Sequence, residues 1–362
     1  MYGPAFALPT TPAAKCLYLM RHQPLMTRAE LMELSGLSQP TVTRAVTALL
    51  QAGLIRQRSD LTRSQGRGRP TIPLQICDTS SMHAGIAVGT HSTYIALFDS
   101  FGRTLRKLDL NLPAARMTDD DGIEHYIAGL HRLTTGLARQ LTSVGFTFPG
   151  HVTDSGVINA PSLGWRDVDI ASRLRYQFSV PVTVAAAVPA ILGSELQNTN
   201  VTFADAPTTT MAFFADDSIG AAVSTGSGVR QLDVTLDEDS ILPTYGLLTG
   251  TTARSLAELV AQHTDASRAL LDRRAQALGE LAAEFIAEQR PSTVVVAGSA
   301  FLEDPHAPGI FARTVRSQLG SGDDDVELRL IPTHREIVLA IARAVALERV
   351  LQDPLHLIPT YP

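Results

Sequence analysis

The chain has 362 residues, of which 44% are apolar and 18% are charged, a composition typical of globular rather than disordered proteins. Its two cysteines exclude a disulfide framework, and its length favours two or three compact units over a single small module. The net charge is −6 but is unevenly divided: residues 1–70 hold nine Lys and Arg against three Asp and Glu, a balance of +6, and the remainder holds 21 basic and 33 acidic residues, a balance of −12. The N-terminal part therefore attracts a polyanion that the rest of the chain repels.

The N-terminus shows no pattern of a signal peptide or membrane anchor. Residues 1–8 are apolar but lack a basic region, are interrupted by Pro4, and are followed by no apolar run near the roughly 20 residues that span a bilayer. We expect a cytoplasmic protein with no membrane partner.

Three short helices are predicted in the N-terminal part. Apolar residues recur with helical spacing over 13–20, and Thr27 with Glu30 three residues later has the pattern of a capping box that starts a second helix. After a glycine turn, Ser38 can cap a third helix over 38–50. This order of helices predicts a helix-turn-helix domain.

The exposed N-terminal side of the third helix has the side chains expected of a DNA recognition helix. They are short or forked hydrogen-bonding groups that can reach base edges or phosphates in a major groove, namely Gln39, Thr41, Thr43 and Arg44. The alternative is a three-helix module that binds protein. The positive charge of residues 1–70 favours double-stranded DNA as the partner.

A basic wing is predicted after the third helix. Segments 54–58 and 72–76 alternate like two short strands, and the tip between them, Gly66-Arg67-Gly68-Arg69-Pro70, resembles the core of AT-hook peptides. We expect Arg67 and Arg69 to enter a narrow, A·T-rich minor groove, where the negative potential is enhanced. The alternative is a flexible basic linker that touches phosphates without sequence preference.

The rest of the chain shows a similar order of elements twice, β-β-β-α-β, which predicts a duplicated α/β domain with a cleft between its halves. In the first half we expect strands over 82–88, 94–99, 105–111, 143–148 and 180–184, and a helix over 123–139. In the second half we expect strands over 208–214, 220–224, 229–236 and 293–297, helices across 255–289, and a closing helix over 336–351.

Several motifs together resemble the ROK family of repressors and sugar kinases. Besides the helix-turn-helix and the Gly-Arg-Gly-Arg-Pro wing, they are Gly-Ile-Ala-Val-Gly-Thr at 85–90, Phe-Pro-Gly at 148–150 and Ala-Pro-Ser-Leu-Gly-Trp at 160–165. The resemblance covers nearly the whole chain. It implies a winged helix-turn-helix followed by an actin-like (ribonuclease H-like), duplicated two-lobed body of the ATPase type.

On this resemblance we expect three domains and three kinds of partner. The winged helix-turn-helix domain would span 1–78, the first lobe 79–200, and the second lobe with an oligomerisation surface 201–362. Family regulators are typically homo-oligomers that bind or release DNA in response to sugars. The expected partners are therefore DNA, further copies of this chain as a homodimer or higher oligomer, and a small effector.

The chain departs from the family's kinases at the residues that carry their chemistry. The Asn-Asp pair that supplies the kinase base is matched by Ala186 and Ala187, and the aspartate of the first phosphate loop by Ala87. Asp216 and Asp217 lie where glycines of the second phosphate loop would admit phosphate. We expect no enzyme activity, because no base remains for a sugar hydroxyl and two carboxylates repel ATP.

The family's zinc and sugar ligands are also missing. The zinc site has no counterpart between 226 and 256, a stretch without Cys or His, and the family's Gly-Glu-x-x-Gly-His sugar contact is deleted around 226–239. We expect no cofactor and no metal. Any effector is expected to be less polar than a hexose.

Such an effector is expected in the interlobe cleft, beside Ser162, Trp165, Ala186, Ala187 and Glu195. The indole of Trp165 can stack on a ligand or anchor the packing of its Pro/Gly-rich loop, and both interpretations stay open.

The sequence thus predicts a sequence-specific, catalytically inactive transcriptional regulator of the ROK type. Two alternatives remain, a sugar kinase with an accessory DNA-binding domain and a DNA-bound scaffold that needs no effector.

Overall fold

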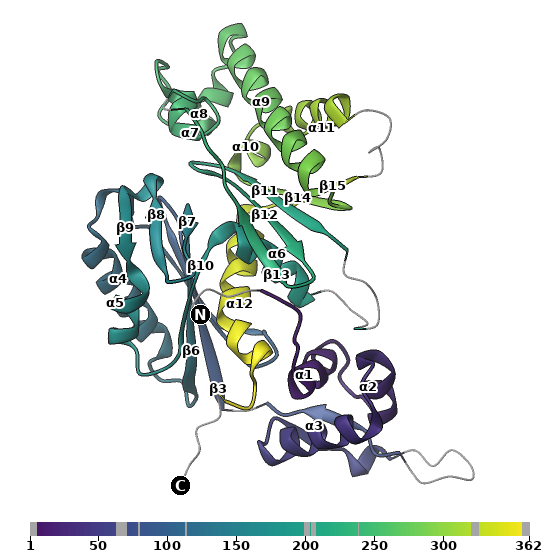
Figure 1. Cartoon of the computed structure of the whole chain (residues 1–362). Coiled ribbons are helices and arrows are strands. Elements are labelled where there is room, and N and C mark those ends of the chain that lie inside the picture. The colour runs from purple at the N-terminus through teal and green to yellow at the C-terminus, as the bar shows by residue number, and fades with distance from the viewer. Residues whose placement is uncertain are drawn as a thin grey trace.

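The computed structural model describes residues 6–62, 71–78, 80–112, 114–198, 203, 208–237, 239–319 and 326–356. A small helical domain, which we call the head, packs against a body of two α/β lobes (Figure 1). No helix in these ranges is long and apolar enough to cross a membrane.

The head folds as its helix signals predict. Thr27 Oγ1 accepts a hydrogen bond from the Glu30 N–H at 3.2 Å, the Glu30 carboxylate accepts one from the Thr27 N–H at 2.6 Å, and Gly36 ends the second helix with a φ of 66°. Leu31 and Val46 belong to one core that joins the helices and strands. The elements are α1 (Pro12–His22), α2 (Arg28–Ser35), α3 (Gln39–Gln51), a 3₁₀ turn (Ser59–Leu61), and the antiparallel pair β1 (Ile55–Gln57) and β2 (Leu74–Ile76).

The first lobe is built on a five-stranded sheet in the order β10-β6-β3-β4-β5. The first three strands in chain order are antiparallel, and the last two run parallel to the first. These strands are β3 (Ser81–Val88), β4 (Thr93–Phe98), β5 (Thr104–Leu110), β6 (Gln140–Phe148) and β10 (Val182–Ala186). Helices α4 (Asp119–Thr134) and α5 (Ile170–Gln177) pack on this sheet, beside a small sheet of β7 (His151–Val152), β8 (Val157–Ala160) and β9 (Trp165–Asp169).

The second lobe repeats this topology, with the strand order β13-β12-β11-β14-β15 and the same pattern of antiparallel and parallel pairs. The repeat confirms the predicted duplication of an actin-like fold. Its strands are β11 (Thr210–Ala215), β12 (Ile219–Thr225), β13 (Gly228–Leu232), β14 (Thr293–Ala297) and β15 (Glu327–Leu330). Its helices are α7 (Thr244–Leu248), α8 (Leu256–Ala261), α9 (Asp265–Gln289), α10 (Ser299–Leu302) and α11 (Ala307–Leu319).

Two helices join the lobes, α6 (Ala187–Asn198) and α12 (His334–Gln352), which pack against each other (Figure 1). After the second lobe the chain returns to the first lobe, where α12 packs across β3 and β6. Gly85 of β3 and Gly145 of β6 are register partners and allow this approach. A Cβ on Gly85 would lie 2.0 Å from the carbonyl oxygen of Ala342, and a Cβ on Gly145 would lie 2.5 Å from that of Val345.

One helix boundary differs clearly from the expected range. The helix expected over 123–139 is α4, which starts four residues earlier, where Thr118 accepts a hydrogen bond from the Asp121 N–H at 3.1 Å. It ends at Thr134, before Gly136 adopts a φ of 75°. The apolar pattern does not reveal the first turn of α4, because its residues Asp119, Asp120 and Asp121 are acidic and exposed or half-buried.

Candidate functional site

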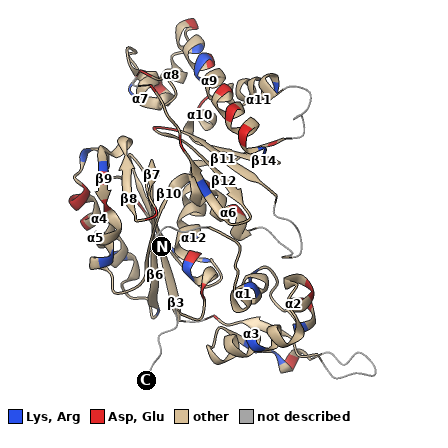
Figure 2. Ribbon diagram, viewed as in Figure 1, with Lys and Arg blue, Asp and Glu red and all other residues tan. Residues whose placement is uncertain are grey.

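Helix α3 presents the predicted recognition side chains on the side opposite its core. Gln39, Thr43 and Arg44 are exposed and Thr41 is half-buried, whereas Val42 is 1% exposed. Helical periodicity produces this division, since one apolar stripe packs on the rest of the head and the other face is left to solvent. The head thus carries a polar, basic helix face (Figure 2).

The hydroxyl groups on this face are already engaged within the helix. Thr43 Oγ1 donates to the Gln39 carbonyl at 2.9 Å, and the Ser38 and Thr41 hydroxyls lie 2.9 Å apart in a mutual hydrogen bond. Ser38 is the N-cap residue as predicted, but its side chain bonds Thr41 instead of a backbone N–H. Within the described ranges no hydrogen bond or ion pair holds the Arg44 guanidinium, which leaves its forked donors available to a ligand.

Thr47 belongs to the same face and was not among the predicted residues. It is exposed one turn after Thr43 and donates to the Thr43 carbonyl at 2.8 Å. The signal was present in the sequence, because residues four apart on a helix share a face.

The base of the wing is ordered by polar contacts between its strands. Gln75 Oε1 accepts hydrogen bonds from Arg56 at 2.9 Å and from Arg58 at 2.7 Å, and Arg58 pairs with Asp60 at 2.6 Å. The tip with Arg67 and Arg69 lies outside the described residues.

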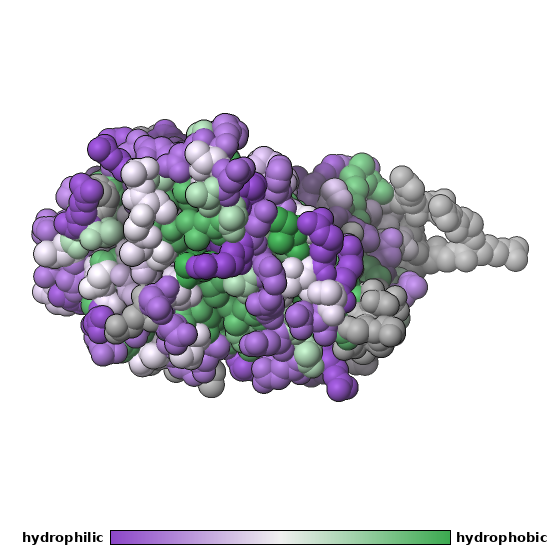
Figure 3. Space-filling view, turned by 90° about the horizontal axis from the view of Figure 1, so that it is seen from above, coloured by the Kyte–Doolittle hydropathy of each residue, from purple (hydrophilic) through white to green (hydrophobic). Residues whose placement is uncertain are grey.

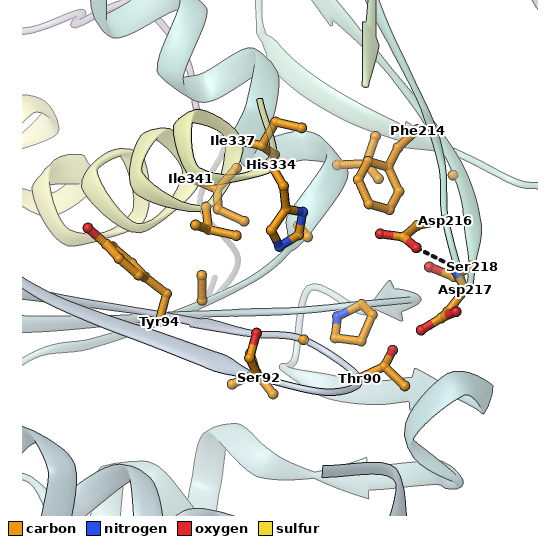
Figure 4. Close-up of a pocket in the computed structure, with 18 of the residues that line it drawn as sticks. Thr90, Ser92, Tyr94, Phe214, Asp216, Asp217, Ser218, His334, Ile337 and Ile341 are labelled. Atoms are coloured by element: carbon orange, nitrogen blue, oxygen red, sulfur yellow. Dashed lines mark hydrogen bonds between the residues drawn. The ribbon is translucent and has the colours of Figure 1, made fainter. Parts of the chain in front are cut away.

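A second candidate site is a cavity of about 350 Å³ between the lobes (Figure 4). It is enclosed by the β3–β4 turn, the β11–β12 turn, the start of α6 and the first two turns of α12. The two turns are those that resemblance assigns to the phosphate loops. Seen from above, apolar residues gather in the middle of the body, with hydrophilic residues around them (Figure 3).

The cavity is apolar at one end and acidic at the other. Tyr94, Ile337 and Ile341 form the apolar end, and the turn that carries Asp216 and Asp217 forms the acidic end (Figure 4). The His334 ring projects from the start of α12 between these ends (Figure 4).

Asp216 is held by donors behind the cavity wall. Its carboxylate accepts hydrogen bonds from Ser299 Oγ at 2.6 Å and from the Asp217 N–H at 3.0 Å, and burial raises the pKa of this carboxyl above its usual range. Asp217 is more open to the cavity, with 23% of its side chain exposed and His91 Nε2 at 3.3 Å. The turn thus presents carboxylates to the cavity, and the Asp216 and Asp217 backbone amides are engaged within the turn.

The buried Arg274, behind the acidic turn, is engaged by oxygens of the second lobe. It is 2% exposed and donates to the carbonyls of Leu242 at 2.9 Å and Asp216 at 3.3 Å, and to Thr244 Oγ1 at 3.2 Å. Burial lowers the pKa of Arg274 to about 10, which the nearby carboxylates partly oppose. This residue fixes the acidic turn from behind.

The five residues expected to bind an effector do not line one common cavity. Ala187 lines the cavity of Figure 4, Ala186 lines a neighbouring hollow of about 410 Å³, and Ser162 lines another of about 340 Å³. Glu195 forms an ion pair with Arg329. Trp165 is packed inside the first lobe.

Of the two interpretations of Trp165, the structure supports the packing anchor. The side chain is 4% exposed, and its ring centroid lies 5.7 Å from that of Phe148. It is not among the residues that line the cavity.

Sequence patterns did not indicate the part of the cavity that α12 provides. The residues concerned are His334, Ile337 and Ile341. The apolar period of this helix was evident, but nothing local says that it returns to the first lobe. Within the described ranges no cluster of three or more His, Cys, Asp or Glu is placed to hold a metal ion.

Two family models match parts of the chain. The model of the ROK family matches residues 83–230, and the model of the MarR family matches residues 10–62. A transcriptional regulator of Mycobacterium bovis is 29% identical in an alignment of 347 residues, and the match covers 84% of this chain and 78% of that protein.

Two solved structures show the same fold. A ROK family transcriptional regulator, described as a homolog of the Escherichia coli MLC protein, superposes with a TM-score of 0.73 at 16% identity and covers 95% of this chain and 97% of its own. A ROK hexokinase from Thermus thermophilus has a TM-score of 0.57 at 18% identity and covers 74% of this chain and 99% of its own. The body thus has the fold of both regulators and kinases.

Proposed function

We propose that this chain is a DNA-binding transcriptional regulator of the ROK type without catalytic activity, because the ROK family model matches residues 83–230, the MarR family model matches residues 10–62, and a transcriptional regulator is 29% identical to the chain. The observation that carries the proposal is the exposed, basic face of α3, with the unengaged guanidinium of Arg44, on a head of opposite charge to the body. Such a face can enter a major groove while the acidic body stays away from DNA.

Three further features support a regulator that has lost kinase chemistry. Ala186 and Ala187 offer no base for a sugar hydroxyl, and Ala87 replaces an acidic residue of the first phosphate loop. Asp216 and Asp217 place negative charge where the phosphates of ATP would bind. We propose that the body responds to a small effector and joins copies of the chain into a homodimer or larger oligomer.

The second candidate function is a sugar kinase with a DNA-binding head, which the fold of the hexokinase favours. The missing base argues against it. ATP-dependent phosphorylation of hexoses at rates above those of a heat-treated control would overturn the proposal of inactivity. Stoichiometric zinc in elemental analysis would overturn the expectation that the chain holds no metal. Product formation no faster than in that control would support the regulator.

The test of DNA binding uses the full chain and an operator obtained by selection from random duplexes. Arg44→Ala is expected to weaken specific binding by roughly 1–3 kcal/mol, the worth of a side-chain contact to a base edge. Arg132→Ala, an exposed arginine on α4 of the body, is the matched control and should leave the affinity unchanged. Equal affinities of the Arg44 variant and the unaltered chain in a fluorescence anisotropy titration would remove Arg44 from the interface.

A further inference from the structure

The cavity beneath α12 has a chemistry that selects among possible effectors. Its volume of about 350 Å³ is at the lower end of small-molecule sites. One end is walled by Ile337, Ile341 and the ring of Tyr94, which are 2%, 5% and 3% exposed. The Tyr94 hydroxyl has no hydrogen-bond partner among the described residues, and Asp109 and Arg335 line the same cavity. A ligand that buried only polar groups there would lose hydrogen bonds to water without replacement.

The other end carries negative charge that the protein itself compensates only in part. Asp217 opens into the cavity, and the one ion-pair contact that it makes within the described part of the chain is to the largely exposed His91. Arg274 donates to three uncharged oxygens instead of to either carboxylate. Glu303 adds to the negative potential at Asp216 and Asp217. An anion would be repelled at this end, whereas a cation would gain a charged partner.

Helix α12 connects the cavity directly to the head. Its first two turns line the cavity, and its nineteen residues extend over roughly 28 Å at 1.5 Å per residue. Farther along, α12 packs against Gly102: a Cβ added to this glycine would lie 3.0 Å from Leu347 and 3.3 Å from Arg343 of α12. The same Cβ would lie 3.1 Å from Arg21 of α1. Arg21 also donates to the Phe101 carbonyl at 3.3 Å. The Phe101–Gly102 turn is therefore packed between α12 and α1 of the head.

We propose that this cavity binds a small organic cation, an amine carried on an apolar body, and that α12 transmits its occupancy to the DNA-binding head. The second half of the proposal rests on the proposed function as a regulator. The apolar body would lie along Ile337 and Ile341, with the ammonium group donating to Asp217. A ligand in this position shifts the head only if it favours one arrangement of α12 over another.

The binding test compares three probes of equal chain length by calorimetry on the full protein: n-octylamine, 1-octanol and octanoate. The amine is expected to bind about 5- to 10-fold more tightly than the alcohol, and octanoate more weakly than both. Asp217→Asn should remove the advantage of the amine and leave the alcohol unchanged. Asp217→Lys should reverse the order in favour of octanoate.

The matched control is Asp233→Asn, a substitution of the same chemistry at an exposed position that does not line the cavity. It should bind all three probes like the unaltered chain. Equal affinities for the three probes, or an amine preference that survives both Asp217 substitutions, would overturn the assignment of the cavity.

Transmission is tested by operator titration with and without n-octylamine. The affinity of the unaltered chain should change about 5- to 150-fold, the usual range of coupling between two sites, and that of Asp217→Asn should not change. Probe binding that depends on Asp217 but leaves operator affinity unchanged would overturn the role of α12. Absence of operator binding in every condition would instead refute the proposed function, while calorimetry would still decide the chemistry of the cavity.

Discussion

Glu348 is a buried carboxyl on α12 at the point where the N-terminal segment meets the body. Its side chain is 4% exposed, and Gln197 Nε2 lies 3.5 Å from its Oε2. Phe6, which is 2% exposed, packs beside it against Gly193 of α6. Burial raises the pKa of Glu348 to about 8, so the folded chain holds this carboxyl protonated at neutral pH.

Because the carboxyl of Glu348 is protonated in the folded chain, we expect the stability of the chain to fall as the pH rises. The pKa is 4.5 in the unfolded chain and about 8 in the folded one, so the folded state binds the extra proton between these values. Stability from this group is present below about pH 4.5 and is lost as the pH rises toward 8, and the loss amounts to on the order of a few kcal/mol by pH 7. Glu348→Gln mimics the protonated form without titrating. Thermal melts should show little effect of this change at pH 5 and a higher Tm than the unaltered chain at pH 8.

The control for this titration is Glu288→Gln at an exposed position of α9, which should not alter the pH dependence. A Tm difference between the Glu348 variant and the unaltered chain that is the same at pH 5 and pH 8 would show that Glu348 does not titrate in this window.

At the level of single residues, sequence patterns predicted what local geometry determines. The capping box of Thr27 and Glu30 involves atoms three residues apart, and α3 exposes the predicted recognition residues because one helical period fixes both of its faces. The sequence did not decide whether Trp165 is buried, because its burial depends on contact with Phe148, which comes from a different strand. The carboxyl at Glu348 gave no signal, since nothing in the sequence near it reveals Phe6 as its neighbour.

At the scale of elements, the position of α12 depends on two glycines. Gly85 and Gly145 leave room for the backbone of α12, and any Cβ at Gly85 would overlap the Ala342 carbonyl. This obstruction is backbone, so the helix must move as a whole. The cavity and the turn at Gly102 lie at opposite parts of the same helix, and both would be disturbed.

Gly85→Ala is therefore expected to destabilise the chain by at least about 2 kcal/mol, the cost of overpacking a dense core. The matched substitution is Gly309→Ala on α11, where a Cβ meets only the flexible Arg313 side chain at 3.6 Å. It should be neutral or stabilising by up to about 1 kcal/mol, because alanine favours a helix over glycine. Urea unfolding measures the stability of both variants. Equal midpoints for the two would show that the position of α12 does not depend on Gly85.

Most elements of the two sheets were predictable from alternation and apolar runs; β14 begins and ends at the expected residues. The elements that were missed have weak local signals. Strand β15 is four residues long at the sheet edge with half-exposed and exposed side chains, and α11 buries few residues. The cavity was only partly predicted. Its acidic turn follows from Asp216 and Asp217, but its α12 wall requires a contact between the C-terminal helix and the first lobe.

At the scale of the whole molecule, the head is fixed to the body by contacts from α1. Tyr18 donates a hydrogen bond to the Leu196 carbonyl at the end of α6, and its ring meets Phe203 edge-on at a centroid distance of 5.7 Å. Lys15 lies over the same Phe203 ring at 5.0 Å. These contacts orient the head, a region of net positive charge in the sequence, relative to the body, whose net charge is negative.

This separation of charge predicts which arginines set the salt dependence of DNA binding. Each phosphate neutralised on B-DNA contributes about −0.9 to the slope of log K against log salt concentration. Replacing Arg67 and Arg69 together by alanine should therefore make the slope shallower by about 2 and flatten the preference for A·T-rich flanks. The matched control replaces Arg273 and Arg316, two exposed arginines of the second lobe, together by alanine. It changes the net charge by the same amount as the wing variant and should leave the slope unchanged. If both pairs changed the slope alike, the charge of the whole chain would govern DNA affinity and the wing would not lie in the minor groove; if neither did, Arg67 and Arg69 would not contact the phosphates.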